Sequence, residues 1–217
     1  SFNQPLSNWN VSQVTDFRSM FEKASVFNQP LNTWTLNTTP GANVNMQFMF
    51  TNAGAFNQDL NSWNVSRVTN MGYMFWNAVA FNGNITNWNV GNVTAMDQMF
   101  RGANSFNQPI GGWNVSNVTN MYAMFANNTA FNQPISNWNV SKVTDFEIMF
   151  GEATAFNQPL NWTINTTPGA TVTMRGMFSY NTVFNQDLNS WNVSRVTNMS
   201  KMFENATAFN GNITNWN

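Results

Sequence analysis

A segment of about 25 residues recurs along the whole chain, and this repetition restricts the possible folds more than any other feature. The copies follow the pattern AFNQPLSNWNVSNVTNMxxMFxxAT and begin at Ser1, Val26, Ala55, Ala80, Ser105, Ala130, Ala155, Val183 and Ala208. A fixed period of 20 to 50 residues is typical of solenoids, in which each repeat forms one coil that packs on its neighbours. We therefore predict one solenoid of about nine coils over residues 1–217.

Aromatic residues recur at three fixed positions of the repeat: the Phe of FNQ, the Trp of WNV and the Phe of the Met-Phe pair. Residues that recur at one position in every coil are expected to stack into ladders along the axis of the solenoid. The Asn that follows the first Phe occurs in all nine copies. We predict that these Asn side chains form a ladder of hydrogen bonds to turn backbone and to each other.

Two periodicities alternate within each coil. In the first coil, Trp9 and Val11 alternate with polar residues, which predicts a short parallel strand whose polar side chains point outward. Apolar residues then recur with the spacing of one helix face, at Val14, Phe17, Met20, Phe21 and Ala24. Each coil should therefore consist of one short parallel β-strand and one short helical arc, which is an α/β solenoid.

The composition argues against catalysis and against several partner classes. The chain has no His and no Cys, which removes the usual nucleophiles, general bases and transition-metal ligands. Its acidic residues are scattered and form no acidic loop of fixed spacing for calcium. We therefore expect no enzyme activity, cofactor or metal. The net charge of −1 predicts no binding to nucleic acid, and no apolar run is long enough for membrane insertion.

The outward polar row of the predicted strands is the first candidate binding face. Its side chains are short, neutral and able to form hydrogen bonds, and they would lie on a flat, regular lattice. Such a surface could meet sugars, another copy of the chain or ice, or it could be a solvated face that keeps the sheet soluble. The candidate residues are Asn8, Asn10, Thr33, Thr35, Asn64, Asn87, Asn89, Asn114, Asn137, Asn139, Thr163 and Asn192.

Two coils carry an insertion with the sequence TTPGA, and both insertions follow the predicted strand. Their exposed positions are candidate lateral contacts: Thr38, Thr39, Pro40, Gly41, Thr166, Thr167, Pro168 and Gly169. The insertions are five coils apart, and AFNGNITNWN at 80–89 returns at 208–217 with the same separation. A super-repeat of about 128 residues is therefore laid over the shorter one, and at ~4.8 Å per stacked strand it advances about 24 Å.

The repeat resembles the 25–26-residue repeat of bacterial surface proteins, first noted in Mycoplasma-type lipoproteins and related to the BspA-like branch of leucine-rich repeats. The segment from Trp63 to Met71, followed by Met74 and Phe75, carries the resemblance, which covers essentially the whole chain. It implies a leucine-rich-repeat-like, right-handed coil stack, display outside the cell, and roles in adhesion or self-association. It brings no catalytic residues.

Two functions follow as expectations. The first is a secreted or cell-surface repeat protein that self-associates, head to tail or laterally, into a fibre, filament or adhesive stalk. Neither end of the sequence offers a polar capping repeat, so we expect the chain to be a segment of a longer array. The alternative is an adhesion module that binds glycans or extracellular proteins through the Asn/Thr/Ser face, with ice binding as a variant.

Overall fold

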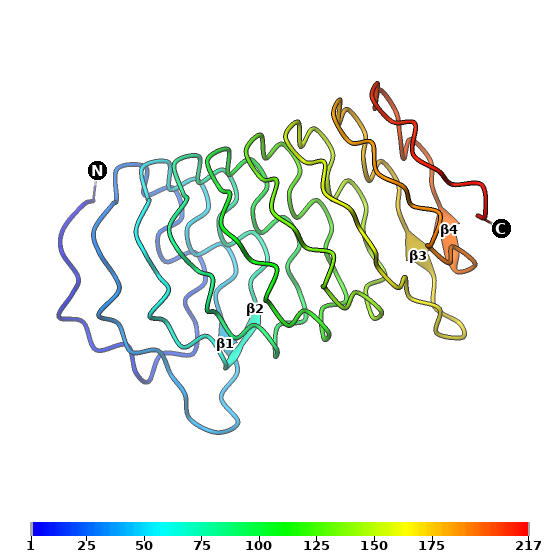
Figure 1. Cartoon of the computed structure of the whole chain (residues 1–217). Helices are drawn as coiled ribbons and strands as arrows, with labels where there is room; N and C mark the ends of the chain where they lie inside the picture. The colour runs from blue at the N-terminus through cyan, green and yellow to red at the C-terminus, as the bar shows by residue number, and fades with distance from the viewer. Residues whose placement is uncertain (1, 217) are drawn as a thin grey trace.

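The chain is a row of stacked coils, each formed by one repeat, in a computed structural model that describes residues 2–216 (Figure 1). Successive coils lie side by side in sequence order, so the first and last coils are at opposite ends of the row. This arrangement confirms a repeated structure with a periodic core of Trp and Phe. The handedness of the coils stays a prediction.

Within residues 2–216 the regular secondary structure consists of four short strands. These are β1 (Val44–Asn45), β2 (Val68–Asn70), β3 (Val172–Thr173) and β4 (Val196–Asn198), which pair in parallel as β1–β2 and β3–β4. Single parallel bridges continue the same ladder through the other coils, at Asp16–Asn45, Asn70–Ala95, Ala95–Asn120, Asn120–Asp145 and Asp145–Thr173. One narrow parallel ladder therefore joins eight coils.

The predicted strand position is wrong. The parallel ladder lies on the Val-Thr-Asn segment, whereas we expected it on the preceding Trp-Asn-Val segment. In the first coil that segment lies between two tight turns, which Trp9 N–H and Val14 N–H close on the carbonyls of Leu6 and Val11. Trp9 and Val11 alternate with polar residues because an extended segment between turns has the same period of two as a strand.

The predicted helical arc is also wrong, since residues 2–216 contain no helix. From Phe17 to Lys23, every second N–H donates to a carbonyl of the second coil, over 2.7–3.1 Å. The intervening N–H groups of Met20, Glu22 and Ala24 donate three residues back and close tight turns. Consecutive turns bury the same i, i+3, i+4 positions as a helix, so the apolar stripe cannot tell the two apart. The neighbouring coil, with a similar sequence, supplies carbonyl groups at matching positions. The N–H groups therefore find their partners between coils, and a helix is not needed to satisfy them.

Three aromatic ladders form the core, as the repeated columns predict. The Phe residues of FNQ stack from Phe2 to Phe209 with ring centroids 5.7–6.2 Å apart. The Phe residues of the Met-Phe pairs form a second ladder from Phe21 to Phe203, at 5.2–5.8 Å. The two ladders contact each other within each coil, for example Phe75 and Phe81 at 3.9 Å.

The tryptophans form the third ladder and also tie each coil to the one before it. Trp63 stacks on Trp34 and Trp88 at 6.1 and 6.3 Å. The indole N–H of Trp88 donates to the carbonyl of Leu60 in the preceding coil at 2.9 Å. The other indoles from Trp34 to Trp216 make the equivalent bond over 2.8–3.2 Å. The core is therefore both stacked and hydrogen-bonded.

The predicted asparagine ladder is confirmed. The side-chain oxygen of each Asn accepts the backbone N–H of the corresponding Asn in the next coil over 2.7–3.0 Å, from Asn3 to Asn210. In most coils the following Gln also donates to the same oxygen, as Gln133 does to Asn107 at 3.0 Å. This ladder satisfies backbone groups that no strand pairs.

The two TTPGA insertions form loops that project from the same edge of the stack (Figure 1). They precede β1 and β3 and have the same internal geometry. Asn37 accepts the N–H of Thr39 and Asn165 that of Thr167, while Gly41 and Gly169 have φ angles of 84° and 82°.

Candidate ligand-binding face

The predicted Asn/Thr/Ser row is exposed at all twelve candidate positions, but it does not lie on a sheet. Half of its residues are part of the turns themselves. The side-chain oxygens of Asn10, Asn64, Asn89, Asn114, Asn139 and Asn192 each accept the N–H two residues on, over 3.0–3.2 Å. Thr33 donates to the carbonyl of Ser7 at 3.1 Å. The repetition of this row is thus explained by local turn structure.

The eight candidate lateral contacts are also exposed. The loops that carry them lie in coils two and seven, shortly before the ladder strands β1 and β3. Nothing in the loops is titratable, so they offer only neutral hydrogen-bonding groups and two proline rings.

A different surface carries the chemical variety of the chain. It is formed by the turns of the segment M-x-x-M-F-x-x-A, whose Met, Phe and Ala side chains point into the core while the x positions do not belong to the core cluster. We call this surface the variable face. It has four columns: Arg18, Gln47, Gly72, Asp97, Tyr122, Glu147, Arg175 and Ser200; Ser19, Phe48, Tyr73, Gln98, Ala123, Ile148, Gly176 and Lys201; Glu22, Thr51, Trp76, Arg101, Ala126, Gly151, Ser179 and Glu204; Lys23, Asn52, Asn77, Gly102, Asn127, Glu152, Tyr180 and Asn205.

A constant backbone supports these changing side chains. Every residue of the second and fourth columns has a positive φ, between 49° and 65°. Even the β-branched Ile148 adopts this left-handed conformation, which such residues rarely do. The hydrogen bonds between coils therefore fix the turn geometry regardless of the side chain, so the face can vary in chemistry without changing in shape.

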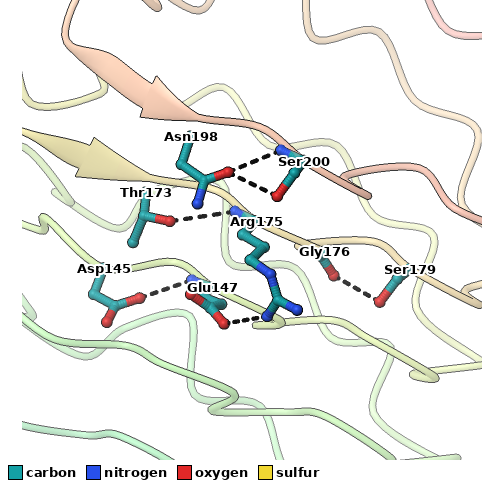
Figure 2. A network of polar contacts seen from close by, with 8 residues as sticks. All are labelled: Asp145, Glu147, Thr173, Arg175, Gly176, Ser179, Asn198 and Ser200. Atoms are coloured by element: carbon teal, nitrogen blue, oxygen red, sulfur yellow. Dashed lines mark hydrogen bonds and ion pairs between the residues drawn. The ribbon is translucent and has the colours of Figure 1, made fainter.

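A row of short polar side chains begins the face in seven of the eight coils. In Figure 2 the oxygens of Asp145, Thr173 and Asn198 each accept the N–H two residues further on, at 2.9, 3.4 and 3.0 Å. Figure 2 also shows an ion pair between coils, in which the guanidinium of Arg175 donates to the carboxylate of Glu147. These contacts hold the first column in place.

Aromatic side chains gather on the variable face in coils two to five. Phe48 and Tyr73 are adjacent in the second column, and their rings stack with centroids 4.5 Å apart. Trp76 meets Tyr73 edge-on at 5.7 Å. All three rings are half-buried, as is Tyr122 two coils on. Half-buried aromatic rings outside the core are the surface groups most often found at binding sites.

A hollow of about 510 Å³ opens beside this aromatic group. It is lined by Asp16, Arg18, Ser19, Gln47 and Phe48, which belong to coils one and two. Asp16 and Arg18 form an ion pair through two guanidinium nitrogens, with the shorter contact at 2.7 Å. Hydrogen bonds from Arg18 lower the pKa of Asp16, so this carboxylate stays ionised in mild acid.

Two other carboxylates of this surface, Asp97 and Asp145, have raised pKa values. Partial burial raises the pKa of Asp97 and of Asp145; for Asp145 the hydrogen bond from the backbone N–H of Glu147 opposes this rise, and the negative charge of Glu147 adds to it. Burial and the charge of Asp97 also raise the pKa of Tyr73. Asp97 lies against the backbone of Gly72, where a Cβ atom would be 2.8 Å from an Asp97 oxygen.

Two further observations concern residues 2–216. They contain no group of three or more His, Cys, Asp or Glu side chains that could hold a metal ion. The same residues include no helix with the length and apolarity needed to cross a membrane.

The residues of the variable face can be recognised in the sequence, but we predicted the binding face at the Asn/Thr/Ser row instead. The x positions of M-x-x-M-F-x-x-A are the least repeated letters of the repeat, whereas the Asn/Thr/Ser row is nearly constant. We expected these positions to lie on helices that cover the sheet, which directed attention to the row. Once the segment is seen as turns, most of these residues lie on the outer surface, whereas Thr51, Gln98, Ala123, Ala126 and four glycines of the same columns are buried.

Comparison with known protein families shows what the chain is similar to. The family model described as "Mycoplasma protein of unknown function, DUF285" matches three times, over residues 1–96, 81–168 and 168–217. The three matches together span the whole chain. Neither the curated proteins nor the solved structures include a match to this chain.

Proposed function

The chain belongs to the family described as Mycoplasma protein of unknown function, DUF285, and we propose that it is a non-enzymatic recognition module that binds its partner through the variable face. Display outside the cell, a role in adhesion and a leucine-rich-repeat-like solenoid class are parts of this proposal. They rest on the resemblance of the repeat to bacterial surface proteins and on a nearly neutral surface, since only 8% of residues are charged.

The proposal rests on a difference between the constant columns of the repeat, which build the fold, and the variable columns, which lie mostly at its surface. The constant Phe, Trp and Met residues fill the core, and the constant Asn and Gln residues bond one coil to the next. The variable columns contribute no side chain to the core cluster and only a few bonds between coils, such as the Glu147–Arg175 ion pair. They hold half-buried aromatic rings and amides on a backbone of fixed geometry. A rigid scaffold with changing surface residues is the arrangement that repeat proteins use for recognition.

A matched pair of triple variants tests the proposal. One variant replaces Phe48, Trp76 and Tyr122 on the variable face by Lys; Lys201 shows that the second column, to which Phe48 belongs, accepts this residue. The other replaces exposed residues of the Asn/Thr/Ser row by Lys, at Asn87, Asn137 and Thr163. Both variants gain the same charge, and thermal unfolding of both verifies that they fold, because the first replaces half-buried rings and the second exposed side chains.

The probe is a printed array of neutral, sulfated and sialylated glycans beside collagen, fibronectin and mucin. We expect the unmodified chain to bind at least one component, the first variant to bind it at least tenfold more weakly and the second to bind it normally. Loss of binding in the second variant alone would move the site to the Asn/Thr/Ser row. An equal loss in both, or no binding by the unmodified chain, would also refute the proposal.

Self-association through the TTPGA loops is a second candidate. Two copies of the same loop, with matching turn geometry, project from one edge of the stack. A fibre made by this contact should be visible by electron microscopy at high protein concentration. Deletion of residues 38–42 and 166–170 should then return the protein to monomers, and monomers at all concentrations before deletion would refute this candidate.

A further inference from the structure

We infer that the hollow between coils one and two is a binding subsite for an uncharged pyranose sugar, which stacks on the exposed side of the Phe48 ring. This inference rests on the proposed function and assigns it a ligand class and a place. It depends on three properties of the hollow: an open aromatic face, a charge-neutral polar wall and a suitable size.

The aromatic face is open because the second column changes from a large to a small residue. Phe48 contacts Tyr73 of the following coil at 4.5 Å, which covers one side of its ring. On its other side the same column holds Ser19, whose small side chain cannot cover the ring. Both Ser19 and Phe48 line the hollow. The C–H groups on one side of a pyranose ring are apolar and pack on such an aromatic surface.

The polar wall carries no net charge. Asp16 and Arg18 are each about half exposed and neutralise each other through their ion pair. The guanidinium donates three bonds to the carboxylate and the backbone N–H of Arg18 a fourth, so the acceptor sites of Asp16 are filled while N–H donors remain on Arg18 for a ligand. These donors can bind a hydroxyl oxygen of a sugar, and Gln47 adds an amide that both donates and accepts.

The same wall argues against a charged ligand. An anion at the remaining donors of Arg18 would lie beside the Asp16 carboxylate, which repels it, and a cation at Asp16 would lie beside the Arg18 guanidinium, which repels it. The groups that remain, Gln47 and Ser19, are neutral. The volume of about 510 Å³ lies within the range of small-ligand sites and exceeds the size of a single sugar ring.

The substitution Ser19→Phe tests the inference because it extends the stack and fills the hollow. Ser19 and Phe48 have φ angles of 55° and 60°, so a Phe already occupies the same backbone conformation one coil away. Lys201→Phe is the matched control, since Lys201 lies in the same column with a φ of 61° but six coils from the hollow. Thermal unfolding of both variants verifies that they fold.

The ligands are the methyl glycosides of glucose, galactose and N-acetylglucosamine, with galacturonate and a 6-sulfated sugar as charged probes. Saturation-transfer NMR and calorimetry should detect a neutral glycoside with a Kd on the order of 1 mM, typical of a small ligand with one stacking contact. We expect Ser19→Phe to weaken binding at least tenfold, and Lys201→Phe to leave it unchanged.

Three results would overturn the inference, and each would lead to a different conclusion about where or what the chain binds. Neutral sugars that bind equally to both variants would place the sugar site elsewhere on the chain. Binding of only the charged probes would contradict the neutral wall. Failure to bind any sugar, while the array still shows binding through the variable face, would refute this subsite and leave the proposed function standing.

Discussion

The tryptophan ladder allows a quantitative prediction about stability. Trp88 is 3% exposed, stacks between Trp63 and Trp113 at 6.3 and 6.2 Å, and donates its indole N–H to Leu60. The substitution Trp88→Phe removes three ring atoms from the core and one hydrogen bond between coils. At ~0.8 kcal/mol per buried carbon and about 1 kcal/mol for the bond, we expect a loss of about 3 kcal/mol.

The hydrogen bond can be separated from the packing. The carbonyl of Leu60 still accepts the backbone N–H of Trp63 at 3.0 Å, so it is not left without a partner. Replacing Trp88 by benzothienylalanine, which has sulfur in place of the N–H and nearly the same shape, should therefore lose only about 1 kcal/mol. The difference between the two variants gives the packing contribution.

Trp9 supplies the matched control. It belongs to the same column but is 53% exposed and makes no indole hydrogen bond within residues 2–216. Thermal unfolding followed by circular dichroism should show a Tm lowered by about 6–12 °C for Trp88→Phe. Trp9→Phe should change the Tm by much less. Equal shifts in the two variants would show that the stack and the bond to the preceding coil do not stabilise the fold as argued.

Three other predictions concern the ladders and the variable face. Gly83→Ala would bring a Cβ within 2.0 Å of a carbonyl oxygen of the preceding coil and should destabilise the fold by more than ~2 kcal/mol in denaturant titration, whereas Gly112→Ala, with open space around it, should be neutral. Asn107→Ala removes the acceptor for two N–H groups of the next coil and should lower the free energy of unfolding by about 1–3 kcal/mol in the same titration. Asn57→Ala removes the acceptor for one N–H group and should cost less. A larger loss of stability for Asn57→Ala than for Asn107→Ala would contradict the proposed role of the ladder. Because burial raises the pKa of Asp97, the folded state binds its proton more tightly than the unfolded state, so stability falls as the pH rises above the unfolded pKa of about 3.9. Asp97→Asn should therefore raise the Tm at pH 7 and raise it less at pH 4, and a constant difference between these pH values would refute the assignment.

The sequence was sufficient to predict what depends on repetition alone. Identical coils in register must place Trp over Trp and Asn over Asn, so the ladders follow whatever the local conformation is. The helix and the strand were not predictable in this way, because both were inferred from the apolar spacing within one coil. Tight turns place Phe17, Met20, Phe21 and Ala24 inward just as a helix would, and only the hydrogen bonds between coils distinguish them.

The hollow beside Phe48 could not be predicted from the sequence for a related reason. The hollow beside Phe48 depends on Ser19 being small in the preceding coil, which is a relation between residues 29 positions apart. Within one coil, neither residue indicates a site. Aligning the coils reveals the contrast between the two side chains, but only the turn geometry shows that both lie on the outer surface.

The bonds between coils have a consequence for how such an array can evolve. The Asn oxygen of each coil accepts a hydrogen bond from the next coil, and its indole N–H donates one to the preceding coil. The same pair of bonds therefore forms at every junction, so a coil that is duplicated or deleted leaves neighbours that still fit together. At two junctions the fit also depends on a glycine, because Gly83 and Gly211 accommodate the carbonyl oxygens of Gln58 and Gln186, which a side chain would strike. Recombination between coils three and four, or eight and nine, would separate these partners. Rearrangement is therefore favoured in blocks that keep both pairs intact, and the 128-residue unit is such a block.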